Sequence, residues 1–211
     1  MSASQSVAAA SRRFLETPPE KMGTYSPRHK VRFVTATALF DGHDASINIM
    51  RRLLQARGAE VVHLGHNRSA MEIVQAALQE DAQAIAISSY QGGHMELFKY
   101  IRDLLNQNGA SDVLIFGGGG GVIVPREIAE LEAYGITKIY SPEDGQRAGL
   151  DGIIGHMLME ADFAYSDWGH RREHQSTQLA RALTLLESGK HTAAELVTAI
   201  ADPRKRFQEV P

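Results

Sequence analysis

A hydrophobic strand ends and a helix begins within the stretch Phe40-Asp41-Gly42-His43-Asp44-Ala45-Ser46. The residues from Lys30 onward are typical of a strand, and apolar side chains then recur at helical spacing at Ile47, Met50, Leu53 and Leu54. In an open α/β sheet, ligands bind outside the carboxyl ends of the strands, where a strand-to-helix loop such as this one lies. The sequence therefore predicts that residues 40–46 border a ligand site.

Strand and helix patterns alternate along the chain after this point. Strands are predicted near Val31–Phe40, Glu60–Leu64, Ala84–Ser88, Val113–Phe116 and Thr137–Tyr140. Helices are predicted near Ile47–Arg57, Ala70–Glu80, His94–Asn106 and Pro125–Ala133, with a fifth after Gly145. Five such units predict an α/β fold with a doubly wound parallel sheet in the flavodoxin-like (Rossmann-like) strand order 2-1-3-4-5. His43 and Ser88 then follow adjacent strands and should face each other across one cleft.

The two ends of the chain lack this alternation. Residues 1–29 are interpreted as an N-terminal arm with a short helix near Val7–Leu15, and residues 30–161 as the ligand-binding domain. Residues 162–211 are interpreted as a helical linker that carries Trp168, with helices near Glu173–Ser188 and Thr192–Ala201.

Composition narrows the class of protein. The formal net charge of -3 gives no reason to expect nucleic acid as a partner. The chain has no cysteine, which excludes disulfides and thiolate metal sites. No apolar run approaches the roughly 20 residues that cross a bilayer, so we expect no membrane partner and a cytoplasmic protein.

The pair Asp41-x-His43 has a clear chemical use. A neutral imidazole can bind a metal through one nitrogen while its other N–H donates to a carboxylate, and Asp41 is placed to be that partner. The alternative is a loop histidine that caps the helix or hydrogen-bonds locally. The tripeptide alone leaves both open.

Two further motifs follow the third and fourth strands. The hydroxyls of Ser88-Ser89-Tyr90 can donate to a ligand nitrogen or phosphate, although such residues are also common in turns. Gly117 to Gly121 are five consecutive glycines, which indicates a close approach to the backbone. They are not a phosphate loop, because Gly-Lys-Ser/Thr does not follow. We interpret them as packing against a bulky ligand, with a flexible turn as the alternative.

Together these elements resemble the cobalamin (B12)-binding domain of the base-off/His-on corrinoid enzymes, the methylmalonyl-CoA mutase family. That family's signature is Asp-x-His-x-x-Gly, Ser-x-Leu and Gly-Gly, and here 41 residues separate Ser46 from Ser88 and 26 separate Tyr90 from Gly117. Two positions depart from the signature, since Ser46 replaces its glycine and Tyr90 its leucine. The amino-acid sequence around the motifs is most similar to that of the N-terminal domain of the fused isobutyryl-CoA mutases.

The resemblance implies adenosylcobalamin as cofactor, with His43 as the lower axial ligand of cobalt in place of the cofactor's dimethylbenzimidazole. It implies that the displaced nucleotide tail enters a slot beside the sheet. The implied cofactor-binding residues are Asp41, Gly42, His43, Asp44, Ser46, Ser88, Tyr90, Gly92, Gly117, Gly118, Gly119, Gly120, Ser141 and Pro142.

The resemblance also implies partners: an acyl-CoA-binding mutase barrel and a P-loop GTPase chaperone domain, in a full-length enzyme that is a homodimer. The radical rearrangement of isobutyryl-CoA to n-butyryl-CoA would need the barrel, so we expect this chain alone to bind cofactor and turn over nothing. A stand-alone corrinoid carrier or cobalamin-sensing module shares the same motifs. A phosphoacceptor receiver domain would need an aspartate where Ser88 stands.

Overall fold

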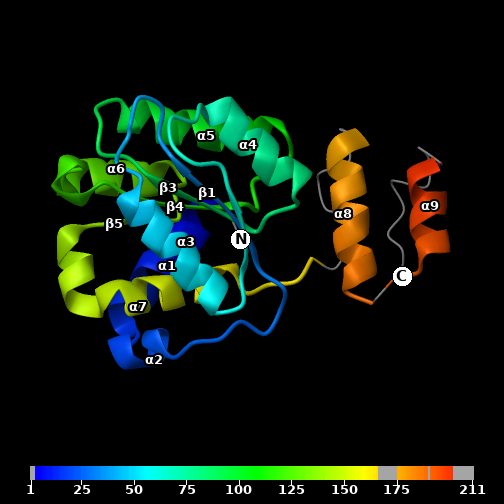
Figure 1. Cartoon of the computed structure of the whole chain (residues 1–211), viewed down its shortest axis with the longest axis horizontal. Coiled ribbons are helices and arrows are strands. Elements are labelled where there is room, and N and C mark those ends of the chain that lie inside the picture. Colours follow the sequence, from blue (N-terminus) through cyan, green and yellow to red (C-terminus); the bar gives the residue numbers. More distant parts are fainter. Residues whose placement is uncertain (1–2, 166–174, 190, 202–211) are drawn as a thin grey trace.

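A five-stranded parallel sheet forms the centre of the computed structural model, which describes residues 3–165, 175–189 and 191–201 (Figure 1). The strands are β1 (Arg32–Thr37), β2 (Glu60–His63), β3 (Ala84–Ser88), β4 (Leu114–Gly118) and β5 (Lys138–Tyr140). They lie in the order β2-β1-β3-β4-β5, with every pair parallel. The predicted fold class and strand order are confirmed.

Helices cover both faces of the sheet. One face packs against α4 (Ala70–Gln79), α5 (His94–Gln107) and α6 (Pro125–Tyr134). The other packs against α1 (Ala3–Glu16), α2 (Pro19–Gly23), α3 (Ala45–Ala56) and α7 (Pro142–Ala161). No helix in the described ranges is long and apolar enough to span a membrane.

Strand β1 is shorter than predicted. It ends at Thr37, and Phe40 has a φ of 64°, a left-handed conformation that no strand continues through. The backbone N–H of Phe40 donates to the side-chain oxygen of Asn67 at 2.9 Å, which ties the loop after β1 to the loop after β2. The turn at Phe40 directs the chain into the Asp41–His43 segment.

The N-terminal segment is packed into the protein. Phe14 of α1 and Met22 of α2 are fully buried in the core between the sheet and α7. The helix predicted near Val7–Leu15 extends over Ala3–Glu16, and α2 was not predicted. These helices complete a core that the predicted domain of residues 30–161 would leave open on that face.

Two C-terminal helices, α8 (Gln175–Glu187) and α9 (Ala193–Ala201), lie to one side of the sheet (Figure 1). Arg181 of α8 makes a buried ion pair with Asp81 at 2.8 Å, and its guanidinium stacks on the Tyr165 ring at 3.5 Å. Removing one partner of a buried ion pair is strongly destabilising, because the other charge stays buried without compensation. This contact therefore holds α8 against the domain. Trp168 and residues 166–174, part of the predicted linker, lie outside the described residues, as do residues 202–211.

The packing of α2 on α7 predicts an effect of Gly155→Ala. An ideal Cβ at Gly155 would lie 1.8 Å from the carbonyl oxygen of Met22, so the helices would have to separate. We expect the free energy of unfolding in urea to fall by about 1–3 kcal/mol, as for other overpacked sites.

The matched control is Gly145→Ala, in the part of α7 before the non-helical break at Gly149, where a Cβ meets nothing within 4 Å. It should leave stability unchanged or raise it by up to about 1 kcal/mol, because alanine favours helix. Equal stabilities for the two variants would contradict the packing of α2 on α7.

Candidate functional site

The carboxylate of Asp41 joins two loops at the carboxyl edge of the sheet. Its Oδ1 accepts hydrogen bonds from the backbone N–H and the ring Nδ1 of His43, at 2.9 and 2.8 Å. Its Oδ2 accepts from the backbone N–H of Tyr90, in the loop after β3. The Asp41 side chain is fully buried, whereas that of His43 is 66% exposed. One buried anion thus orients an exposed imidazole.

This contact determines which ring nitrogen of His43 is available. A carboxylate only accepts, so Nδ1 carries the proton and, in the neutral ring, Nε2 keeps its lone pair. A carboxylate on the far nitrogen is the arrangement that orients metal-binding histidines. Among the described residues, no three His, Cys, Asp or Glu side chains gather as a metal-binding cluster.

The hydrogen bonds to Asp41 also determine its ionisation. Burial by itself raises the pKa of this carboxyl group, but the N–H groups of Tyr90 and His43 and the His43 ring outweigh burial and lower the pKa below its ordinary value. The carboxylate is therefore ionised at neutral pH, the form that accepts all three bonds.

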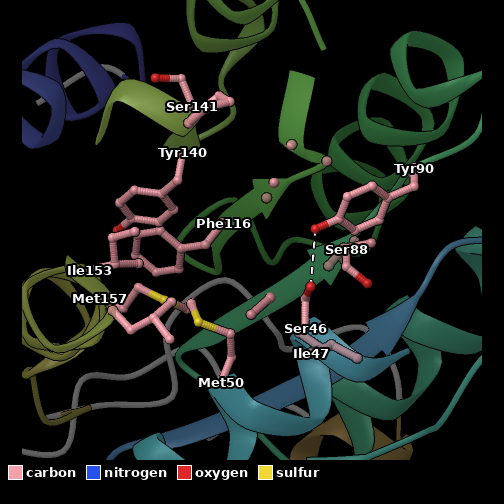
Figure 2. Close-up of a pocket in the computed structure, with 18 residues that line it drawn as sticks. Ser46, Ile47, Met50, Ser88, Tyr90, Phe116, Tyr140, Ser141, Ile153 and Met157 are labelled. Carbon is pink, nitrogen blue, oxygen red and sulfur yellow. Dashed lines mark hydrogen bonds between the residues drawn. The ribbon is translucent and has the colours of Figure 1, made fainter. Parts of the chain in front are cut away.

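A cavity of about 240 Å³ lies between the carboxyl ends of β3, β4 and β5 and the helices α3 and α7 (Figure 2). The predicted site residues that line it are Ser46, Ser88, Tyr90, Gly117, Gly118, Gly119, Gly120, Ser141 and Pro142. Those outside its lining are Asp41, Gly42, His43, Asp44 and Gly92. His43 nevertheless lies close to the cavity, because its ring centroid is 5.6 Å from that of Tyr90.

The glycine run has a different role at each position. A Cβ at Gly117 would lie 2.4 Å from the Phe98 ring, and one at Gly119 would lie 2.0 Å from the Ser89 carbonyl oxygen. At these two positions the predicted close approach is to the protein itself. A Cβ at Gly118 would meet only the Tyr140 carbonyl oxygen, at 3.5 Å.

Small residues open the cavity on one face of the sheet. Side chains alternate along β4, so Gly118 lies on the same face as Phe116, which packs in the core beside α7. Ala86 and Ser88 of β3 also line this space. The missing bulk at Gly118 and the small side chains of β3 leave room that larger residues would fill.

The walls on α3 and α7 were missed by the sequence analysis. Met50, Leu150, Ile153 and Met157 line the cavity, and their helical spacing was visible but also typical of ordinary core. Tyr140 lines it too. Its hydroxyl donates to Nδ1 of the fully buried His156 at 2.7 Å, and His156 Nε2–H donates to the carbonyl oxygen of Ala10 at 3.1 Å.

This buried chain of hydrogen bonds ties a cavity wall to α1. Burial first, and then nearby carboxylates, raise the pKa of Tyr140 well above 10, so it stays a neutral donor. Its hydroxyl is bonded to His156, and the Tyr140 ring lines the cavity as an apolar wall. Figure 2 shows this ring beside Phe116 and Ile153. No local signal in the sequence pairs Tyr140 with His156 and Ala10.

Comparison with known proteins gives one family and several relatives. The B12 binding domain model matches residues 31–145. The fused isobutyryl-CoA mutase of Geobacillus kaustophilus is 58% identical over 197 residues, 89% of this chain and 18% of that protein. The glutamate mutase sigma subunit 1 of Haloarcula marismortui is 30% identical over 133 residues, 61% of this chain and 85% of that protein. A solved cobalamin-binding protein from Desulfitobacterium hafniense aligns with a TM-score of 0.49 at 22% identity, over 61% of this chain and 58% of that one.

The buried Asp41 carboxylate predicts an acid-dependent stability. Asp41→Asn should lower the free energy of unfolding at pH 7 by about 1–3 kcal/mol, because an amide nitrogen cannot accept one of the buried hydrogen bonds. The folded-state pKa is below the unfolded value of about 3.9, so the stabilisation is complete above that value and is lost as the pH falls through the folded-state pKa.

Denaturation curves of both proteins between pH 7 and 3 measure this effect. The difference in stability should narrow below about pH 4, and carboxylates common to both proteins cancel. Asp44→Asn is the control, since the Asp44 side chain makes no capping hydrogen bond and should change stability by less than about 0.5 kcal/mol. A difference that stays constant down to pH 3 would contradict the role given to Asp41.

Proposed function

The chain belongs to the B12-binding domain family, and on that premise we propose that it binds adenosylcobalamin base-off, with His43 as the lower axial ligand of cobalt. The observation that carries this proposal is the exposed side chain of His43, whose Nδ1 is held by the buried Asp41 at 2.8 Å. His43 lies in the loop after β1, at the carboxyl edge of the sheet where open α/β folds bind ligands, and Asp41 leaves its Nε2 unengaged.

The cavity is proposed to receive the displaced nucleotide tail. It is lined mainly by apolar side chains, with the hydroxyls of Ser46, Ser88 and Tyr90 at one end (Figure 2). An apolar wall with a few polar groups suits an aromatic base joined to a ribose phosphate. Ser88 donates to the Thr37 hydroxyl at 3.2 Å, which leaves its own oxygen lone pairs for a ligand.

We propose that the wider protein is an acyl-CoA mutase that converts isobutyryl-CoA to n-butyryl-CoA. When bound, adenosylcobalamin supplies a cobalt–carbon bond whose homolysis starts such radical rearrangements. This chain spans less than a fifth of the length of the fused mutase of Geobacillus kaustophilus. The acyl-CoA barrel, the GTPase chaperone domain and the homodimer are proposed to belong to the full-length enzyme, with residues 162–211 as a linker toward the GTPase. In this proposal the chain by itself holds and orients the cofactor.

A second candidate is a stand-alone corrinoid carrier or cobalamin-sensing module. A separate chain of about this domain's size is known among the relatives, because the alignment covers 85% of the Haloarcula marismortui sigma subunit, which is named as a subunit of glutamate mutase. The two candidates predict different activities when the chain, loaded with adenosylcobalamin, is mixed with a fused-mutase barrel and isobutyryl-CoA. Turnover of isobutyryl-CoA supports the mutase, and none supports the carrier or sensor.

An absorbance titration with adenosylcobalamin tests the axial ligand. The wild-type chain should give the spectrum of nitrogen-ligated cobalt with the benzimidazole displaced. His43→Ala should lose that spectrum and bind more than about 100-fold more weakly, beyond the losses seen when only a ligand's hydrogen-bond partner is removed.

His66→Ala is the matched control, because His66 is an exposed histidine in the neighbouring loop after β2. It should titrate like the wild type. If His43→Ala binds as tightly as the wild type with an unchanged spectrum, His43 is not the ligand.

Gly118→Ala tests the cavity as the tail site. The added methyl group meets no atom of the protein closer than 3.5 Å but enters the face that lines the cavity, so the fold should persist while adenosylcobalamin affinity falls about tenfold or more. Gly121→Ala is the control, since a Cβ there meets nothing within 4 Å and the residue is outside the cavity lining. Equal affinities for the two variants would place the tail elsewhere.

A further inference from the structure

Two hydroxyl groups meet across one end of the cavity. Ser46 Oγ, in the first turn of α3, lies 3.0 Å from the hydroxyl oxygen of Tyr90, in the loop after β3 (Figure 2). These are the two positions at which the chain departs from the family signature, 44 residues apart in sequence. Glycine and leucine at these positions could not make this hydrogen bond. The two departures are therefore one coupled feature.

The pair lies at the end of the cavity nearest His43. The Tyr90 ring lies against the His43 ring, with centroids 5.6 Å apart. On its other side, Tyr90 Cε1 is 3.1 Å from the position a Cβ would take at Gly120. Tyr90 thus stands between the proposed axial ligand and the glycine loop, and its hydroxyl reaches α3.

The side chains of the pair can separate without moving the loops that carry them. The backbone N–H of Tyr90 is held by Asp41, so rotation of the tyrosine side chain opens the contact while the loop stays in place. Within the described part of the chain, each hydroxyl hydrogen-bonds only to the other. Breaking the bond therefore frees two groups that water or a ligand can satisfy at once.

We propose that the Ser46–Tyr90 hydrogen bond is a latch that a nucleotide tail must open to enter the cavity, and that it sets the rate at which tailed corrinoids load. The inference rests on the proposed function. In this proposal the tail leaves a corrin on His43 and enters the cavity between α3 and the loop after β3, which this bond joins.

Stopped-flow absorbance with two ligands tests the latch. Adenosylcobalamin carries the nucleotide tail, and adenosylcobinamide lacks it but can still place cobalt on His43. Ser46→Ala and Tyr90→Phe each remove the bond and keep most of the side-chain volume. Each should speed adenosylcobalamin loading about 2- to 10-fold, the change in rate that corresponds to one net hydrogen bond.

Two comparisons make the result specific. The double variant should load no faster than either single variant, because all three lack the same bond. Adenosylcobinamide should load at one rate in all four proteins. Amide hydrogen exchange in the ligand-free proteins gives a second readout, and should be faster in the first turn of α3 when the bond is removed.

The outcomes separate the latch from the proposed function. Wild-type loading rates in the variants, or an equal acceleration with adenosylcobinamide, would overturn the latch while corrinoid binding stands. A wild-type chain that binds neither corrinoid would overturn the proposed function, and the role of the latch with it. Additive acceleration in the double variant would show that the two residues act separately and would also overturn the proposal.

Discussion

The site depends on one buried anion. Burying an ionised carboxylate is very unfavourable unless hydrogen bonds replace its water, and Asp41 obtains three from two loops. The chain can satisfy this side chain only by bringing the start of α3 next to the loop after β3. That requirement orients the His43 ring, positions the backbone of Tyr90, and thereby defines one end of the cavity.

The cavity exists because close packing is interrupted at selected positions. Protein interiors normally pack without voids larger than a water molecule, so an open space needs small residues on one side and rigid walls on the other. Gly118, Ala86 and Ser88 supply the first condition. The rigid walls are α7 and Tyr140, whose hydroxyl is hydrogen-bonded to His156, which in turn is hydrogen-bonded to α1. Helix α1, far from β5 and α7 in sequence, thus supports a wall of the candidate ligand site.

Sequence patterns were sufficient for the fold and for the loop that carries Asp41 and His43. The alternation of strand and helix and the five-unit count led to the observed strand order, because these depend on local periodicity and on general rules of chain connection. The same order places His43 and Ser88 at the ends of paired strands β1 and β3. The Asp41-x-His43 contact also followed from the sequence, since both residues lie in one short loop.

Contacts between distant segments were decided only by the tertiary structure. The five glycines are alike in sequence, and only packing against Phe98 and Ser89 separates Gly117 and Gly119 from Gly118, which faces the cavity. The Ser46–Tyr90 hydrogen bond likewise depends on how closely α3 approaches the loop after β3. By itself the sequence determined the α/β fold and the loop that carries the candidate ligand, because these follow from local patterns. The shape of the cavity and its closure depend on side chains that meet only after folding.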